Sequence, residues 1–212
     1  NLGNALLALD RPKLAMDRYK LALAIAPNSA QAHNNYGSAL HALGKLDAAI
    51  ARFWQALMHD PDLVEAHYNL GNALVAQGKP ETAVSCYRRV LALRPDHVEA
   101  HNNLGNAYLA LGQPGEASAC FRHAVTCKPD YAEGWLNLGN SEQALGKFTE
   151  AIESYRQALR VRADFAEAHN NMGNALQALA RFAEAAESHR QALTLNPRYP
   201  DAYFNLGNAL IQ

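Results

Sequence analysis

One short motif, Asn-Leu-Gly-Asn-Ala, returns along the chain at a fixed spacing, and this period constrains the fold more than any other feature. It stands at residues 69–73 and 103–107 and recurs with small variations at every multiple of 34 residues, without an insertion or deletion. The glycines in register are Gly3, Gly37, Gly71, Gly105, Gly139, Gly173 and Gly207. A fixed period between about 20 and 50 residues is typical of a solenoid. The chain is therefore predicted to be a quasi-linear array in which each unit contacts only its neighbours.

Glycine and proline divide each unit into two segments. A glycine tolerates the positive φ of a helix end, and one stands after the first segment at Gly44, Gly78, Gly112 and Gly146, with Asp10 and Ala180 in the other units. A proline closes the unit at Pro27, Pro61, Pro95, Pro129 and Pro197. Between these marks lie two apolar-periodic segments, for example roughly 99–111 and 114–127. Each unit is thus predicted to be a hairpin of two helices, here called helix A and helix B, and the fold class is all-α.

Small and large residues alternate along helix B at helical spacing. An alanine recurs at Ala15, Ala49, Ala83, Ala117, Ala151 and Ala185. A ring follows four residues later at Tyr19, Phe53, Tyr87, Phe121, Tyr155 and His189. This spacing places both on one face of the helix, where they are expected to pack against helix A.

These marks resemble the tetratricopeptide repeat family, whose 34-residue pattern is W-x2-L-G-x2-Y, then A-x3-F, then Pro. The match here reads His67-x2-Leu70-Gly71-x2-Leu74, then Ala83-x3-Tyr87, then Pro95. The Trp position departs from the pattern, with His33, His67, His101 and His169, and with Trp135 and Tyr203. The resemblance covers the chain as a single array: a partial unit 1–29, full units 30–63, 64–97, 98–131, 132–165 and 166–199, and a partial helix A at 200–212. It implies a right-handed superhelical solenoid of antiparallel hairpins whose A helices line the concave face.

Asparagines recur on the arc of helix A that faces away from helix B. At about 100° per residue, His101, Leu104 and Tyr108 share one arc, and Asn103 and Asn106 lie on the opposite one. The first ladder is Asn1, Asn35, Asn69, Asn103, Asn137, Asn171 and Asn205. The second is Asn4, Asn72, Asn106, Asn140, Asn174 and Asn208, with Ser38 as its exception. A third row holds Asn34, Asn102 and Asn170, interrupted by Tyr68, Leu136 and Phe204.

A carboxamide has one acceptor and two donors, so it can bind both the N–H and the C=O of an extended peptide. Neighbouring helices pack ~8–10 Å apart and an extended chain advances ~3.3 Å per residue. One amide could therefore hold about every third peptide residue, while Tyr68 and Leu136 supply local apolar contact. A structural role stays open, in which the amides connect neighbouring helices. Each asparagine costs a helix up to ~0.7 kcal/mol relative to alanine, so one of the two roles must offset that cost.

The charges of helix A argue against a clamp for a C-terminal carboxylate, because cations are almost absent from this face. Its rim carries Gln31, Glu65, Glu99, Glu133, Glu167 and Asp201, and deeper positions carry Ala8, Ala42, Ala76, Ala110, Ala144 and Ala178. Such a groove tolerates basic or neutral peptides. The cations lie mainly on helix B, where a solvated outer face is predicted.

No catalytic residue, metal or cofactor is predicted. The nine histidines include four at the Trp position, which lie one unit apart and so cannot share a zinc ion. No recurring nucleophile or phosphate-cradling glycine loop is present. The three cysteines read as small hydrophobic residues of a reducing compartment, so a cytoplasmic protein is expected. A net charge of −1 and the lack of a long apolar run argue against nucleic acid and membrane as partners.

The leading prediction is a non-catalytic scaffold that binds an extended peptide or protein segment through the asparagine ladder. The unbroken Asn-Leu-Gly-Asn-Ala-Leu run is also similar to the substrate-reading superhelix of O-linked N-acetylglucosamine transferases and SPINDLY-type proteins. That resemblance implies, as one alternative, the recognition arm of a larger enzyme. Self-association is the other alternative, because arrays usually end in a polar capping helix whereas the final segment keeps Tyr203, Leu206 and Leu210 on an apolar face.

Overall fold

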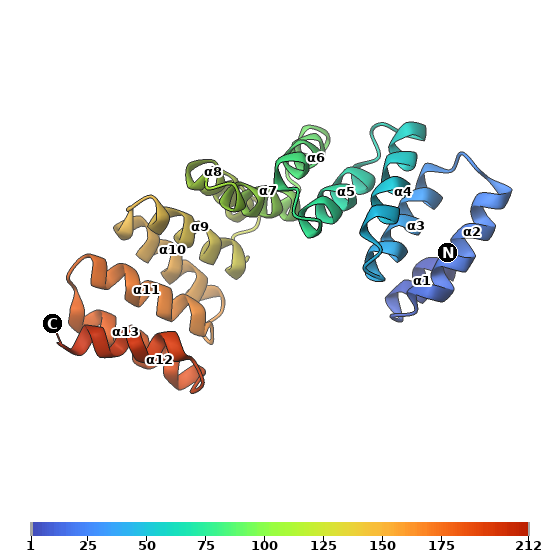
Figure 1. Cartoon of the computed structure of the whole chain (residues 1–212). Helices are drawn as coiled ribbons and strands as arrows, with labels where there is room; N and C mark the ends of the chain where they lie inside the picture. Colours follow the sequence, from blue (N-terminus) through green and yellow to red (C-terminus); the bar gives the residue numbers. More distant parts are fainter. Residues whose placement is uncertain (1, 212) are drawn as a thin grey trace. The chain divides into compact units, whose positions relative to one another are not determined.

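The computed structural model describes residues 2–211, and within that range it contains helices and connecting turns but no strand. The contacts between residues divide the chain into two compact units, residues 1–111 and residues 112–212, which are described here one at a time. Each unit is a stack of antiparallel helix hairpins (Figure 1). The predicted all-α fold of helical hairpins is confirmed.

In the first unit, the A helices are α1, α3, α5 and α7, and the B helices are α2, α4 and α6. The A helices span α1 (Leu2–Ala8), α3 (Ala30–Ala42), α5 (Val64–Ala76) and α7 (Val98–Ala110). The B helices span α2 (Pro12–Ile25), α4 (Leu46–His59) and α6 (Pro80–Leu93). Each A helix packs on the B helix that follows it and on the one that precedes it, apart from the end helices.

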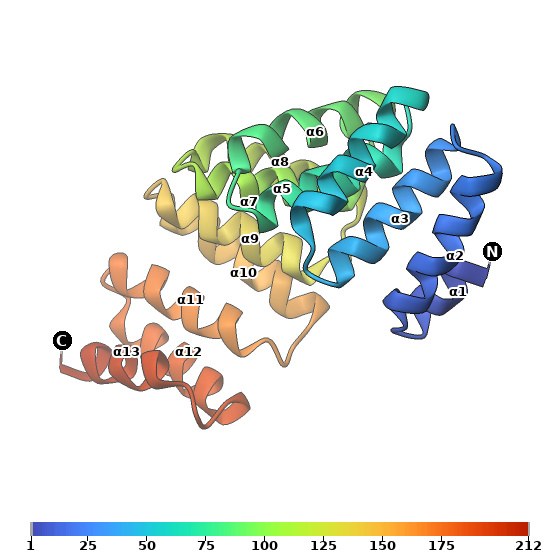
Figure 2. The ribbon, with the colours of Figure 1, turned by 45° about the vertical axis from the view of Figure 1, so that its right-hand side comes forward.

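The second unit continues the same alternation. Its B helices are α8 (Pro114–Cys127), α10 (Phe148–Val161) and α12 (Phe182–Leu195). Its A helices are α9 (Ala132–Ala144), α11 (Ala166–Ala178) and α13 (Pro200–Ile211). Consecutive A helices contact each other in both units, whereas consecutive B helices among the described residues do so at most weakly. Each unit therefore curves with its A helices on the inner side, as the first unit shows in Figure 2.

The turns between helix A and helix B have the conformation that the glycines predict. Gly44, Gly78, Gly112 and Gly146 have φ between 69° and 78°. At the first of them, the Lys45 N–H donates to the Leu40 carbonyl at 3.0 Å and the Gly44 N–H donates to the His41 carbonyl at 2.8 Å. This is the Schellman arrangement, which satisfies carbonyls at a helix end. Asp10 and Ala180 adopt the same left-handed backbone, with φ of 53° and 57°.

The core of each hairpin lies where the ring of helix B meets the backbone of helix A. Tyr19, Phe53, Tyr87, Tyr155 and His189 are at most 1% exposed. The recurring glycine of helix A makes this contact possible, because a Cβ atom on Gly71 would lie 2.7 Å from Cε1 of Tyr87. The motif glycine is therefore a packing requirement of the hairpin.

The residues at the Trp position share one hydrogen bond. The Nε2 atoms of His33, His67 and His101 lie 2.8–2.9 Å from the carbonyl oxygen of the proline six residues earlier. Trp135 donates from Nε1 to the Pro129 carbonyl at 2.9 Å, and the Tyr203 hydroxyl donates to the Pro197 carbonyl at 3.4 Å. Histidine can thus take the place of tryptophan, because both offer a ring N–H to the carbonyl of the proline that ends the preceding 34-residue repeat. With Nε2 protonated, Nδ1 has no donor to offer, which fits the unpaired buried Nδ1 atoms of His33 and His169.

Candidate functional site

The amide NH2 groups of the first ladder bind the preceding repeat. Asn69 Nδ2 donates to Asn34 Oδ1 at 3.0 Å and to Ser38 Oγ at 3.3 Å. Asn103 Nδ2 donates to Asn72 Oδ1 at 2.9 Å and to the Tyr68 hydroxyl at 3.1 Å. These acceptors lie 31 and 35 residues earlier in the sequence. The prediction that the first-ladder amides are free to bind a peptide is therefore wrong for the NH2 groups of Asn69 and Asn103.

The second unit repeats this pattern. Asn171 Nδ2 donates to Asn140 Oδ1 at 2.9 Å, and Asn205 Nδ2 donates to Asn170 Oδ1 at 3.2 Å. Asn35 uses its oxygen instead, which accepts from Gln31 Nε2 at 3.0 Å and from Asn34 Nδ2 at 3.3 Å. Asn137 is half-buried. Asn1 lies outside the described residues, as does the side chain of Asn4. The structural alternative of the sequence analysis, in which amides connect neighbouring helices, accounts for the donors of Asn69, Asn103, Asn171 and Asn205.

The third row is not on the groove surface, so its prediction is corrected. Asn34, Asn102 and Asn170 are only 3–8% exposed. Each donates its Nδ2 to the next asparagine in sequence, at 3.3–3.4 Å. Their buried oxygens serve the inter-repeat bonds: Asn34 Oδ1 accepts from Asn69, and Asn170 Oδ1 accepts from Asn205.

The two apolar contacts predicted beside this row are also corrected. Leu136 is 5% exposed and packs in the core of the second unit, near Ile152 and Tyr155. Tyr68 is half-buried and stacks on His97, with ring centroids 5.1 Å apart, while its hydroxyl accepts from Asn103. Both side chains therefore stabilise the array, and neither is free for a ligand.

The second ladder is different, because its amides leave donor groups unused by these contacts. Asn72 Oδ1 accepts from the Tyr87 hydroxyl at 2.8 Å and from Asn103 Nδ2 at 2.9 Å. Asn140 Oδ1 accepts in the same way from Tyr155 at 2.9 Å and from Asn171 at 2.9 Å. Asn72 thus forms a triad with Tyr87 and Asn103, and Asn140 forms one with Tyr155 and Asn171, in which the asparagine oxygen accepts both hydrogen bonds. The Nδ2 atoms of Asn72 and Asn140 take no part in these bonds. Burial raises the pKa of the Tyr87 and Tyr155 hydroxyls, which keeps them protonated as donors.

Two further members of this ladder, Asn106 and Asn174, lie outside such triads. Asn106 is exposed and Asn174 is half-buried. The residue 15 positions after Asn72 and Asn140 is a tyrosine, but after Asn106 it is Phe121 and after Asn174 it is His189. Neither of these two residues supplies a phenol hydroxyl, so the donor that fixes Asn72 and Asn140 is lacking.

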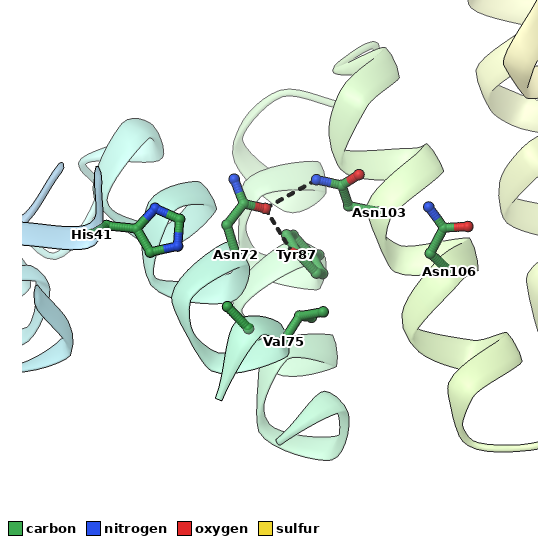
Figure 3. A pocket seen from close by; sticks show the side chains of 7 residues that line it. His41, Asn72, Val75, Tyr87, Asn103 and Asn106 are labelled. Carbon is green, nitrogen blue, oxygen red and sulfur yellow. Dashed lines mark hydrogen bonds between the residues drawn. The ribbon is translucent and has the colours of Figure 1, made fainter. Parts of the chain in front are cut away.

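A hollow of about 250 Å³ opens on the A helices of the first unit, lined by His41, Asn72, Val75, Ala76, Tyr87, Asn103 and Asn106. Figure 3 shows the Asn72 oxygen joined to Asn103 and Tyr87, while its nitrogen points away from both and no dashed line reaches Asn106. Val75 and Ala76 are exposed and form an apolar wall. The hollow therefore combines amide donors with an apolar surface across three neighbouring A helices.

Small residues and carboxylates border this surface. The A helices other than α13 each end in an exposed alanine, at Ala8, Ala42, Ala76, Ala110, Ala144 and Ala178. The rim residues Glu65 and Glu99 are exposed, and Glu99 lies 3.3 Å from His97. In the second unit, Glu133 pairs with Arg162 at 2.6 Å. The rim is acidic but partly compensated.

Neither a metal site nor a membrane span is found in the part of the chain that the structure describes. No group of three or more His, Cys, Asp or Glu side chains among those residues is placed to hold a metal ion. No helix within residues 2–211 combines the length and apolar composition needed to cross a bilayer.

Sequence reasoning missed the inter-repeat acceptors, although a signal for them exists. Each first-ladder asparagine from Asn35 to Asn205 has Asn or Ser 31 residues earlier. Asparagine also stands 15 residues before each tyrosine or histidine of the helix B ring and before Phe121, whereas Ser38 stands 15 residues before Phe53. The pairs 31 residues apart could have been read as hydrogen-bond partners between adjacent repeats, and the Asn–Tyr pairs 15 residues apart as partners within one hairpin.

The stack of hairpins and its repeated contacts define an all-α repeat protein. The TPR repeat profile matches residues 37–78, 71–112, 139–179 and 181–212, and related tetratricopeptide repeat profiles match residues 98–131, 19–51 and 165–196. The chain belongs to the tetratricopeptide repeat family, whose repeats are generally interaction modules without catalytic activity. Comparison with curated protein sequences gave no match.

Solved structures share this fold. PilF of Pseudomonas aeruginosa is 19% identical, with a TM-score of 0.83 over 98% of this chain and 94% of that one. YrrB, described as a TPR protein with an unusual peptide-binding site, is 21% identical, with a TM-score of 0.79 over 88% of this chain and 96% of YrrB. A thermophilic TPR protein of Thermus thermophilus is 27% identical, with a TM-score of 0.61 over 87% of this chain and 100% of its own.

Proposed function

We propose that this chain is a non-catalytic scaffold that holds an extended peptide segment of a partner protein on the inner face of its A helices. The hollow lined by Asn72, Val75 and Asn106 is the single observation that carries the proposal. YrrB, with a similar fold, is described as having a peptide-binding site. In the first unit, the proposal narrows the predicted site from all the asparagines to Asn72 and Asn106 of the second ladder; Asn140 and Asn174 hold the same registers in the second unit.

The free donors decide what part of a peptide this surface reads. Asn72 presents Nδ2 and Asn106 presents a whole carboxamide. An amide donor binds a peptide carbonyl, and the Asn106 oxygen can also accept from a peptide N–H. Such contacts read the main chain and carry little sequence preference. The first-ladder asparagines contribute indirectly, because Asn103 fixes the oxygen of Asn72 and thereby turns the Asn72 nitrogen outward.

The apolar wall and the rim restrict the side chains of the ligand. Val75 and the exposed alanines offer room for one medium-sized apolar side chain in a volume of about 250 Å³. The rim glutamates favour basic or neutral flanking residues over acidic ones. The preferred ligand is therefore an extended, neutral-to-basic segment with a central aliphatic residue.

A peptide array tests the proposal. Twelve-residue peptides with a central Leu, Val or Ala, flanked by Lys, Ser or Glu, are probed with the intact chain and with Asn106→Ala. Asn106→Ala should weaken binding of all positive peptides about 5- to 30-fold, because one or two hydrogen bonds of about 1 kcal/mol each are removed. Lys-flanked peptides should bind more tightly than Glu-flanked ones.

Gln55→Ala is the matched control, since Gln55 is an exposed amide on helix B. It should leave the array pattern unchanged. Equal losses in Asn106→Ala and Gln55→Ala, or equal binding by Asn106→Ala and the unaltered chain, would refute the groove site.

Self-association is a second candidate, favoured by exposed apolar residues on the last helix, α13, and on the B helix of the first hairpin, α2. On α13, Tyr203, Phe204 and Leu210 are 57–71% exposed, and on α2, Leu21 and Ile25 are 57% and 87% exposed. Light scattering over a hundredfold range of concentration tests it: a mass that rises with concentration supports it, and a constant monomer mass excludes it. The role as recognition arm of a glycosyltransferase stays a prediction.

A further inference from the structure

One B helix departs from the other five on its outer face. The register of Lys20 carries a cation in five units, at Lys20, Arg88, Arg122, Arg156 and Arg190. In α4 this position is Trp54, which is 51% exposed, and Met58 one turn later is 79% exposed. The register of Met58 is otherwise held by alanine, threonine or arginine. A large exposed apolar pair therefore occurs here and not at the equivalent place of any other unit.

The second unit shows what surrounds this register. Arg122 and Thr126 of α8 line a groove with Glu150 and Glu153 of α10, over the A helix α9, in a hollow of about 330 Å³. Arg122 reaches down to α9, where its guanidinium donates to the buried Glu142 carboxylate at 2.9 Å. The groove between α8 and α10 is thus filled by a cation, with carboxylates on its far wall.

Both walls of the α4–α6 groove have lost these charges. By the 34-residue period, Trp54 and Met58 take the places of Arg122 and Thr126, and Thr82 and Ser85 take the places of Glu150 and Glu153. The floor residue is Leu74, 5% exposed, in place of Glu142. Arg89, which takes the place of the lining residue Gln157, is paired with Asp62. Relative to the α8–α10 groove, the cation, the anions and the buried carboxylate are all replaced by uncharged residues, and Trp54 and Met58 are the replacement that no other repeat shares.

We propose that this groove, defined by Trp54, Met58, Thr82 and Ser85, is a second protein-interaction surface, and that it binds one amphipathic helix of a partner through an uncharged apolar stripe. The partner stripe must be uncharged because neither wall offers an unpaired opposite charge, and burying an unpaired charge is costly. Exposed tryptophan and methionine are enriched in interface cores, and tryptophan is a frequent energetic hot spot.

A helix fits this surface better than an extended strand or a second copy of the chain. An extended segment would lay its row of backbone N–H and C=O groups over Trp54 and Met58, which offer them the Trp54 ring N–H as their one strong partner, whereas a helix satisfies its own backbone groups. Two side chains that are partly exposed present on the order of 200–300 Å². That is well below the ~800 Å² per partner of a stable dimer, but it suits the narrow stripe of one helix packed on two others.

A displayed peptide library provides the test. Its members are 15-residue helical frames of Ala, Glu, Lys and Gln, with four positions at i, i+3, i+4 and i+7 drawn from Leu, Ile, Met, Phe and Ala. The bait is Trp135→His, a change to the residue that His101 shows at the same register, so that Trp54 is the sole tryptophan. Enriched peptides are then titrated while the Trp54 fluorescence is followed.

The expected result is a blue shift of Trp54 emission and a loss of affinity of at least tenfold in Trp54→Arg. This variant restores the residue of Arg88 and Arg122, so the fold is expected to persist, which far-UV circular dichroism checks. Asn106→Ala should bind the same peptides unchanged, which separates this surface from the groove of the A helices. Failure to enrich any peptide, equal binding by Trp54→Arg, or a dimer of the chain that Trp54→Arg abolishes would each overturn the proposal.

Discussion

Replacing Asn69 by alanine separates the structural role of the first ladder from a role confined to the ligand. Asn69 donates to Asn34 Oδ1 at 3.0 Å and to Ser38 Oγ at 3.3 Å. Each lost hydrogen bond costs about 1 kcal/mol, and the Asn34 oxygen, on a side chain that is 3% exposed, loses a partner in a buried place, which costs about 1–3 kcal/mol. The gain in helix propensity returns at most ~0.7 kcal/mol. When the Asn34 bond is counted once, as the loss at its buried oxygen, and the Ser38 bond as about 1 kcal/mol, the net effect is a destabilisation of about 1–3 kcal/mol.

The sign of the change in unfolding free energy distinguishes a structural role of Asn69 from a role confined to the ligand. If Asn69 served only a ligand, alanine would stabilise the free chain by up to ~0.7 kcal/mol, because alanine is the better helix former. Urea unfolding followed by circular dichroism measures the difference, with Asn106→Ala as the matched control on the exposed asparagine. Asn69→Ala should unfold at lower urea than the unaltered chain and Asn106→Ala at the same or slightly higher urea. An Asn69→Ala midpoint equal to or above that of Asn106→Ala would refute the reasoning.

Three further predictions follow from packing and protonation. Gly71→Ala should destabilise the chain by about 1–3 kcal/mol, because its Cβ would lie 2.7 Å from the Tyr87 ring. Gly207→Ala has no such neighbour within 4 Å and should stabilise the chain by about 0.5–1 kcal/mol. Thermal melts that rank the two variants the other way contradict this account of the motif glycine. Burial lowers the pKa of His169 and His189 below the ordinary 6.5. As the pH falls through this range, the unfolded chain therefore binds more protons than the folded chain. The thermal unfolding midpoint should fall as the pH is lowered from 7.5 to 5.5. His169→Trp, which keeps a ring N–H donor as Trp135 does, should reduce that pH dependence, and an unchanged slope would exclude His169 as a source. Burial raises the pKa of the Cys86 thiol to about 11. Cys86 should therefore react with iodoacetamide at pH 8 far more slowly than the exposed Cys127. Equal labelling of the two cysteines in a mass-spectrometric time course would contradict the packing of α6.

The hairpins could be predicted from the sequence because each signal for them is local. The 34-residue period, the positive-φ glycines and the alanine–ring spacing of helix B each depend on residues within one unit. The helix predicted at roughly 99–111 spans Val98–Ala110 in the structure, and that predicted at 114–127 spans Pro114–Cys127.

The orientation of the amides could not be predicted in the same way. Asn103 and Asn106 share one arc of α7, so helical geometry alone gives both the same face. What separates them is an acceptor on another helix, 31 residues earlier for Asn103, and its distance depends on how one unit packs on the next. The predictions for Leu136 and Asn34 failed for the same reason, because the neighbouring 34-residue repeat covers positions that a single hairpin leaves open.

The central claim is that a bound peptide meets the outward amides of the second ladder and not those that join the repeats. Two-dimensional NMR of the side-chain NH2 groups, assigned with Asn72→Asp, Asn103→Asp and Asn106→Ala, tests it on titration with the tightest peptide of the array. Peptide addition should shift the NH2 resonances of Asn72 and Asn106 and leave that of Asn103 nearly unchanged. Shifts confined to Asn103, or to side chains of the B helices, would contradict the account.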